Sequence, residues 1–202
     1  MDAIGLGDSP SRADLANMLI SGREGVAKDH TRAFGLVEEG ARLGCHHCQG
    51  VMASCYLRGY GCAKDAARSL AFARSSEGKG SKYGQCILGD LYRKGAGGVA
   101  QDYAAAVAQY RLAAAQEYDI AQHNLGCMYG MGCGVAQDKA GALRWYKLAA
   151  AQGLGGALDN VGVYYEHGMD VAADRAEAIR WYKRAAAAGE SIATDSLTRL
   201  GA

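Results

Sequence analysis

The sequence predicts an all-α fold, a right-handed α/α superhelix in which two-helix repeats stack on one another. First, one unit recurs along nearly the whole chain, so that the stretch 125–153 is followed by the similar stretch 161–189. Second, an Asp returns in every unit, at positions 29, 65, 102, 138 and 174. Third, half of the residues are hydrophobic, and Ala and Gly are abundant, which suits closely packed helices. A period of about 36 residues is typical of helical repeat arrays.

Other residues keep phase with the five Asp residues. Nine or ten residues before them stand Leu19, Tyr56, Tyr92, Tyr129 and Tyr165. Seven residues after them stand Leu36, Phe72, Gln109, Trp145 and Trp181. Fifteen residues after them stand Gly44, Gly80, Glu117, Gly153 and Gly189. An extra Gly within 95–98 explains the one longer interval, and chance does not place this many registers in phase five times.

The shared pattern, LGxxYxxGxGVxxDxxxAxxWYxxAAxxG, resembles the Sel-one-like repeat, a relative of the tetratricopeptide repeat. The resemblance covers roughly residues 11–200. Repeats three to five match it well, whereas repeats one and two are degenerate, with Leu36-Val37 and Phe72-Ala73 in place of Trp-Tyr. The resemblance implies a solenoid and an adaptor role, as in signalling, protein quality control or the assembly of membrane complexes.

We expect a short flexible arm over 1–8 and a single repeat domain over 9–202. The repeats are predicted at about 9–44, 45–80, 81–117, 118–153 and 154–189, followed by a capping segment over 190–202. Ser9-Pro10 reads as the start of the first helix, because Ser favours the N-cap and Pro the first helical position.

Each repeat is predicted to hold a first helix, helix A, and a second helix, helix B. Helix A is expected at about 10–20, 46–58, 82–94, 119–131 and 155–167. Helix B is expected at about 30–43, 66–78, 103–116, 139–152 and 175–188. A lone helix A at about 190–200 would cap the array, with Leu197 and Leu200 packed on repeat five and a polar outer face.

The recurring residues have predicted structural roles. Each Asp is expected to be the N-cap of helix B rather than a catalytic carboxylate, since one per repeat cannot gather at a single site. Asp174 and Glu177 have the spacing of a capping box. The register of Gly89, Gly126 and Gly162, with Ala16 and Ala53 in the first two repeats, would let helices approach closely. On helix B, Ala106, Ala142 and Ala178, each four residues after an Asp, would be buried. Trp145, Trp181 and the adjoining Tyr residues would fill the space between repeats.

Composition excludes several classes of function. The net charge is +1 and no long charge run occurs, so nucleic-acid binding driven by charge is not expected. No secretory signal and no apolar run of about 20 residues is visible, which predicts a cytoplasmic protein that does not insert into membranes. Seven Cys residues lie at unlike places in the repeats, whereas disulfide-bonded members of the family need a pair at one place. Reduced thiols are therefore expected.

Two motifs suggest chemistry that we do not predict. The segment Gly130 to Gly134 is Gly-rich, but no strand precedes it and similar turns recur, so it reads as a helix hairpin rather than a phosphate loop. The five His residues are scattered, and neither a Cys–His nucleophile nor a GxSxG motif is apparent. The prediction is a protein that is not an enzyme and needs no cofactor.

One cluster has metal-like spacing. It is Cys45-His46-His47-Cys48, but four adjacent ligands on one helix cannot all reach one ion. Cys45, Cys48, Met52 and Cys55 share a helix face and are predicted to form part of the core. The alternative is a small thiol- or metal-dependent hydrolase, or a metal-binding protein, that uses this cluster.

The leading hypothesis is a non-enzymatic scaffold that binds an extended peptide or a partner protein along a concave face formed by the A helices. Arg58, Arg93 and Lys94 would hold acidic groups, and Tyr83, His123 and Met131 would take side chains. Asp90, Asp159 and Glu166 are predicted on the same face. Self-association stays open as a further alternative, with Leu36 and Val37 of the degenerate first repeat as a docking edge.

Overall fold

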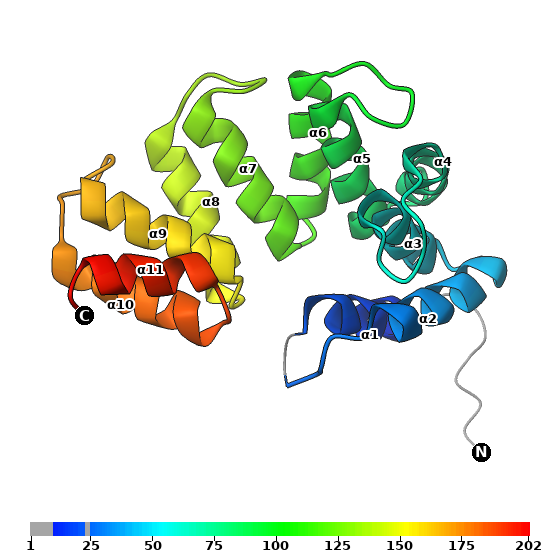
Figure 1. Ribbon diagram of the computed structural model, residues 1–202. Coiled ribbons are helices and arrows are strands. Elements are labelled where there is room, and N and C mark those ends of the chain that lie inside the picture. The colour runs from blue at the N-terminus through cyan, green and yellow to red at the C-terminus, as the bar shows by residue number, and fades with distance from the viewer. Residues whose placement is uncertain (1–9, 23–24) are drawn as a thin grey trace. The chain divides into compact units, whose positions relative to one another are not determined.

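The computed structural model describes residues 10–22 and 25–202, and this part of the chain holds eleven α-helices and no strand (Figure 1). They are α1 (Pro10–Ser21), α2 (His30–Arg42), α3 (His46–Arg58), α4 (Ala66–Glu77), α5 (Lys82–Lys94), α6 (Tyr103–Ala114), α7 (Asp119–Met131), α8 (Lys139–Ala151), α9 (Gly155–His167), α10 (Arg175–Ala187) and α11 (Ser191–Arg199). The predicted all-α fold, with five helix pairs and a final lone helix, is confirmed. The arm and the Ser9 cap lie outside the described residues.

The five recurring Asp residues are N-caps of the B helices, as predicted. A carboxylate oxygen of each accepts a hydrogen bond of 2.7–2.9 Å from the backbone N–H three residues on. This satisfies one of the donors that a helix start leaves without an intrahelical partner. The predicted capping box at α10 does not form. The Glu177 carboxylate instead accepts from Trp181 Nε1 at 2.7 Å, and the Asp174 N–H donates to the carbonyl of Tyr165.

The hydrogen bond from the backbone N–H of the capping Asp recurs in every repeat. It explains why a second recurring position lies nine or ten residues before the Asp. The backbone N–H of each capping Asp donates, at 2.8–3.0 Å, to a carbonyl near the end of the preceding helix A. The acceptors are Leu19, Tyr56, Tyr92, Tyr129 and Tyr165. The spacing between these two positions is therefore fixed by the backbone of the helix hairpin.

Glycines with positive φ end the A helices. The caps after α3, α5, α7 and α9 are Gly59, Gly95, Gly132 and Gly168, with φ between 63° and 78°. In the Gly-rich segment after α7, Gly132 and Gly134 have positive φ, whereas Gly130 is still helical. Only Gly adopts this left-handed conformation without steric cost, which confirms the hairpin interpretation.

The chain divides into two compact units, 1–113 and 114–202. In the first unit, α3 packs on α4 and α5, and α2 packs on both α1 and α3. Its core includes Ala53, Leu70, Ile87, Leu88 and Leu91. In the second unit, each helix from α7 to α11 packs on the next, and Leu197 and Leu200 of the capping segment lie against its core, as predicted.

Tyr and Gly pair where helix B meets helix A. A Cβ added to Gly89, Gly126 or Gly162 would lie only 2.6–2.7 Å from a ring carbon of Tyr110, Tyr146 or Tyr182, respectively. The predicted close approach is thus confirmed. These three Tyr residues are buried, whereas Trp145 and Trp181 are only half-buried. The main filling residue is therefore the Tyr, not the Trp.

In the degenerate repeats a smaller residue replaces the Tyr of this pair, and Ala replaces the Gly. Val37 and Ala73 occupy the Tyr register, and Ala16 and Ala53 occupy the Gly register. All four are fully buried. Val37 is therefore not available for the predicted docking edge, because its side chain is part of the core of the first unit, whereas Leu36 is half-buried.

Candidate partner-binding face

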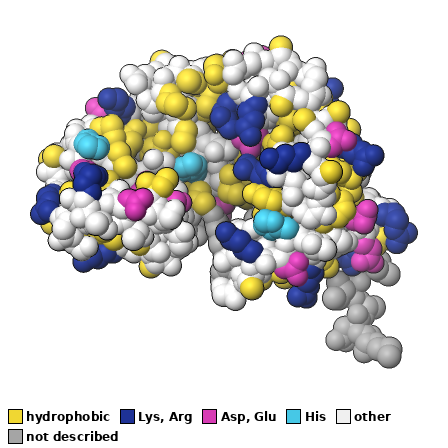
Figure 2. All heavy atoms as spheres, viewed as in Figure 1, with side chains coloured by type: hydrophobic (Ala, Val, Ile, Leu, Met, Phe, Trp, Pro, Cys, Tyr) yellow, Lys and Arg dark blue, Asp and Glu magenta, His cyan; other side chains and the backbone are white. Residues whose placement is uncertain are grey.

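The residues predicted to line the helix-A face differ in their exposure. Arg58, Lys94 and Met131 are exposed, and Arg93, His123, Asp159 and Glu166 are half-buried. Tyr83 and Asp90 are buried, with 4% and 1% of their surface exposed, so neither presents a free side chain on this face. The hydroxyl of Tyr83 donates to the carboxylate of Asp14 on α1. In the space-filling view, basic and acidic side chains are interspersed with apolar ones over the described surface in view (Figure 2).

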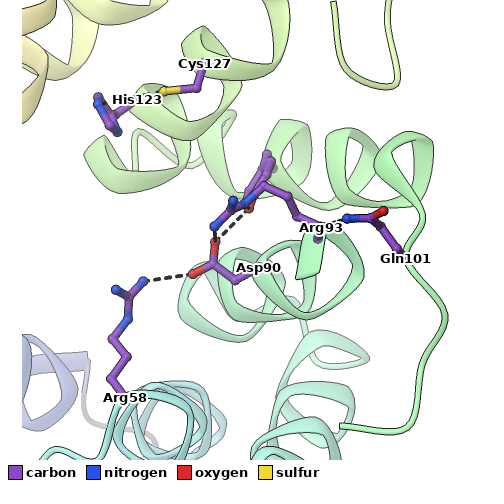
Figure 3. Close-up of polar contacts among 7 residues, drawn as sticks. Arg58, Asp90, Arg93, Gln101, His123 and Cys127 are labelled. Carbon is purple, nitrogen blue, oxygen red and sulfur yellow. Dashed lines mark hydrogen bonds and ion pairs between the residues drawn. The ribbon is translucent and has the colours of Figure 1, made fainter. Parts of the chain in front are cut away.

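Asp90 is the centre of a polar network in the first unit, which we call the Asp90 network (Figure 3). Its Oδ2 accepts a hydrogen bond of 2.8 Å from Nη2 of Arg58, and its Oδ1 accepts one of 2.7 Å from the hydroxyl of Tyr110. Arg93 Nη2 lies 3.8 Å from Oδ1, and Arg93 Nε donates to the Tyr110 hydroxyl at 3.3 Å. The Gln101 amide in turn donates to the carbonyl of Arg93 at 2.9 Å.

The local sequence explains why a carboxylate is buried here. Asp90 follows Gly89, on which the Tyr110 ring packs, so the Tyr hydroxyl reaches the carboxylate. A buried carboxylate needs opposite charge and hydrogen bonds to offset its desolvation, and the two Arg residues with Tyr110 supply them. Burial, followed by the charge of Asp90, raises the pKa of Tyr110, so the hydroxyl stays protonated and donates.

The two Arg side chains connect the buried carboxylate with the surface. Each is 38% exposed, whereas the side chain of Asp90 is only 2% exposed. Two positive charges and one negative charge leave a net charge of +1, and Lys94 at the end of α5 adds another. Guanidinium groups that are held in place recognise carboxylates and phosphates with defined geometry.

The second unit contains a different cluster of polar side chains, centred on α7, which is helix A of the fourth repeat. His123 and Cys127 lie one helical turn apart on α7, with Cys127 Sγ 4.0 Å from His123 Nε2. The hydroxyl of Tyr146 donates to the same sulfur at 3.4 Å, and Asn160 Nδ2 lies 2.9 Å from His123 Nε2. This pair was not predicted, because each His was considered by itself. The signal was present, because the spacing i, i+4 places two residues on one helix face.

A third polar group anchors the capping helix α11. Both oxygens of Glu166 accept hydrogen bonds from Arg199, at 2.5 and 2.9 Å, and Tyr182 donates to Glu166 at 2.7 Å. The Arg199 hydrogen bond lowers the pKa of Glu166 to about 2, with Tyr182 contributing. Asp159 differs, because burial and the charges of nearby carboxylates raise its pKa.

The metal-like cluster is mainly structural. Cys45 is the N-cap of α3, because its Sγ accepts from the N–H of Cys48 at 3.3 Å. The predicted core stripe of Cys45, Cys48, Met52 and Cys55 is buried, as expected. Among residues 10–22 and 25–202, no three His, Cys, Asp or Glu side chains are grouped so that they could hold a metal ion. None of the seven cysteines, all of which lie in the described part of the chain, forms a disulfide.

None of the helices described in the structure combines the length and the apolar character needed to cross a membrane.

Comparison with known proteins identifies the repeat. The family model described as the Sel1 repeat matches residues 9–45, 46–77, 82–118, 119–154 and 156–190. A comparison with curated proteins gives no match.

Several solved structures are similar to this chain. A Sel1 repeat protein from Oxalobacter formigenes is 28% identical, with a TM-score of 0.72, over 96% of this chain and 81% of its own. A protective antigen of uropathogenic Escherichia coli with an SLR fold is 30% identical, with a TM-score of 0.65, over 91% of this chain. This chain spans only 39% of that antigen. An immunity protein from Pseudomonas aeruginosa is 19% identical, with a TM-score of 0.62 over 92% of this chain and 69% of its own, and shares the fold.

Five matches to one repeat model agree with the five repeats predicted from the spacing of the Asp residues, and they cover most of the chain. The protein belongs to the Sel1 repeat family.

Proposed function

We propose that this protein is an interaction scaffold that binds a segment of a partner protein on the helix-A face, where the Asp90 network takes an acidic group. Sel1 repeat proteins generally mediate protein–protein interactions and are typically not catalysts. The observation that carries the proposal is the pair of guanidinium groups of Arg58 and Arg93, held by one buried carboxylate while more than a third of each side chain reaches the surface.

The structure favours an acidic ligand group for a physical reason. Holding a long basic side chain in one rotamer normally costs conformational entropy when a ligand binds. In the Asp90 network this cost is already met in the free protein, because the hydrogen bonds to Asp90 and Tyr110 fix both Arg side chains. Binding of a carboxylate or phosphate would therefore lose less entropy than binding to mobile lysines.

The two Arg residues are poor targets for a charge-reversal test. Arg58→Glu or Arg93→Glu would place a second carboxylate beside buried Asp90, so loss of binding would be confused with loss of folding.

Lys94 gives a cleaner experiment, because it is exposed and ends α5 next to Arg93. The matched control is Lys79→Glu, an exposed Lys in the turn before α5 that undergoes the same change of charge. Wild type, Lys94→Glu and Lys79→Glu would be used to capture partners from a source lysate, with identification by mass spectrometry. We expect a partner that Lys94→Glu loses and Lys79→Glu keeps, and whose binding weakens when its own acidic residues are neutralised. Equal capture by all three proteins would refute this site.

A further inference from the structure

We propose that Cys127 is a reactive thiol activated by His123, and that it forms mixed disulfides with small disulfide compounds. The inference concerns a site separate from the Asp90 network and does not depend on partner binding. It rests on four side chains of the second unit: Cys127 and His123 on α7, Tyr146 on α8 and Asn160 on α9.

The thiol has two polar neighbours with complementary roles. His123 Nε2, 4.0 Å from Sγ, is positioned to take the thiol proton. The Tyr146 hydroxyl donates to Sγ at 3.4 Å, which favours the negatively charged thiolate. The ring of Tyr146 packs on Gly126, so the hydroxyl is held in position. Burial raises the pKa of Tyr146, so this donor keeps its proton.

Asn160 contacts the same nitrogen of His123 as the thiol does. The Asn160 amide lies 2.9 Å from His123 Nε2, and its N–H can donate to the one lone pair of that atom, so the thiol proton reaches Nε2 only when this N–H is turned away. A reversed amide presents its oxygen to the protonated ring, so one side chain supports both states. Burial by itself lowers the pKa of His123, but the hydrogen bond and charge of Cys127, with Asn124 and Asp119, outweigh it and leave the pKa raised. The imidazole is therefore a better proton acceptor than burial alone would allow.

The other thiols differ from Cys127 in their burial or in their surroundings. Cys45, Cys48, Cys55 and Cys86 are buried, and burial raises the pKa of Cys55 to about 12. Burial also raises the pKa of Cys62. Cys133, in the turn after α7, is half-buried like Cys127 but makes no side-chain hydrogen bond within the described part of the chain. Cys133 is therefore the internal reference for reactivity.

The proposed reaction is thiol–disulfide exchange with a small disulfide as co-reactant. The proton of Cys127 moves to His123 Nε2, and the thiolate attacks one sulfur of the disulfide. A new S–S bond forms as the old one breaks, and the departing thiolate takes the electron pair and then a proton from His123 or water. No other oxidant is required, since the disulfide is reduced as Cys127 is oxidised.

The test measures modification of each Cys in the full chain by mass spectrometry after exposure to glutathione disulfide near pH 7. Lowering a thiol's pKa by one unit gains about eightfold in thiolate but loses about threefold in nucleophilicity, so about threefold remains. We therefore expect Cys127 to react about threefold faster than Cys133. His123→Asn should bring the Cys127 rate down to that of Cys133, with a melting curve to confirm folding.

A second readout separates activation from altered packing. The ultraviolet absorbance of thiolate, taken as the difference between wild type and Cys127→Ser, should fall in His123→Asn. Tyr146→Phe keeps the ring on Gly126 and removes only the hydroxyl, so it should slow Cys127 while leaving Cys133 unchanged. If Cys127 reacts no faster than Cys133, or if neither variant changes its rate, the proposal is wrong.

Discussion

The Asp90 network of the first unit and the Glu166 network of the second are made from the same three kinds of side chain. In each, a Tyr eight residues after a capping Asp donates a 2.7 Å hydrogen bond to a carboxylate on the preceding helix A. In each, an Arg from another A-type helix binds that carboxylate, from α3 in one case and from α11 in the other.

The two networks differ in how deeply the carboxylate is buried. Asp90 directly follows Gly89 and its side chain is 2% exposed, whereas Glu166 comes four residues after Gly162 and its side chain is 11% exposed. The deeper carboxylate lies between two Arg residues, and the shallower one binds a single, mostly exposed Arg199. The comparison teaches that a buried Tyr hydroxyl needs a polar partner. The partner can stand at different positions of helix A in different repeats.

The largest expected effect comes from disturbing the Tyr–Gly packing that the two networks share. Gly89→Ala or Gly162→Ala would place a methyl group 2.6 Å from the Tyr110 or Tyr182 ring, and both Tyr residues are fully buried. We expect each change to lower the free energy of unfolding by about 2 kcal/mol, measured by denaturant titration. The matched control is Gly35→Ala on α2, where an added Cβ meets nothing within 4 Å. A loss at Gly89 no larger than at Gly35 would contradict the Tyr–Gly packing.

The next effect separates the two networks. Arg58→Ala leaves the buried Asp90 carboxylate with Arg93 and Tyr110 only, and we expect a loss of about 2 kcal/mol, moderated by the partial exposure of Arg58. Arg199→Ala breaks a surface ion pair, so it should have a smaller effect on global stability and mainly increase fraying of α11. Hydrogen exchange of the α11 amides would show the latter. Equal losses in the free energy of unfolding for the two variants would show that the deeper burial of Asp90 does not make its Arg partner more important.

A smaller effect is the pH dependence of the Glu166 network. The folded-state pKa of Glu166 is lowered to about 2 from the ordinary value of 4.5. Its stabilisation is therefore full above about pH 4.5 and is lost as the pH falls toward 2. The melting temperature of wild type should fall more steeply over this window than that of Glu166→Gln. Parallel curves for the two proteins would show that Glu166 does not titrate with this shift.

The smallest expected effect lies at the surface of the first unit. Lys94→Glu should change the free energy of unfolding by less than about 0.5 kcal/mol, because Lys94 is exposed. Its expected consequence is on partner binding alone, which distinguishes it from Arg58→Ala. A clear loss of stability in a denaturant titration would show that Lys94 belongs to the supporting structure.

The sequence by itself determined the repeat fold, because the registers of the capping Asp and of the helix-ending Gly have a local backbone cause. An Asp caps a helix with its own side chain and a Gly ends one through its own φ, so Asp138 and Gly132 could be assigned without tertiary contacts. The tertiary structure decided what the chemistry-bearing side chains do. Asp90 and Tyr83 looked like surface residues, yet Tyr110 and Asp14, which contact them, come from other helices. Burial and hydrogen bonding depend on such distant neighbours, whereas helix periodicity gives only the direction in which a side chain leaves its own helix.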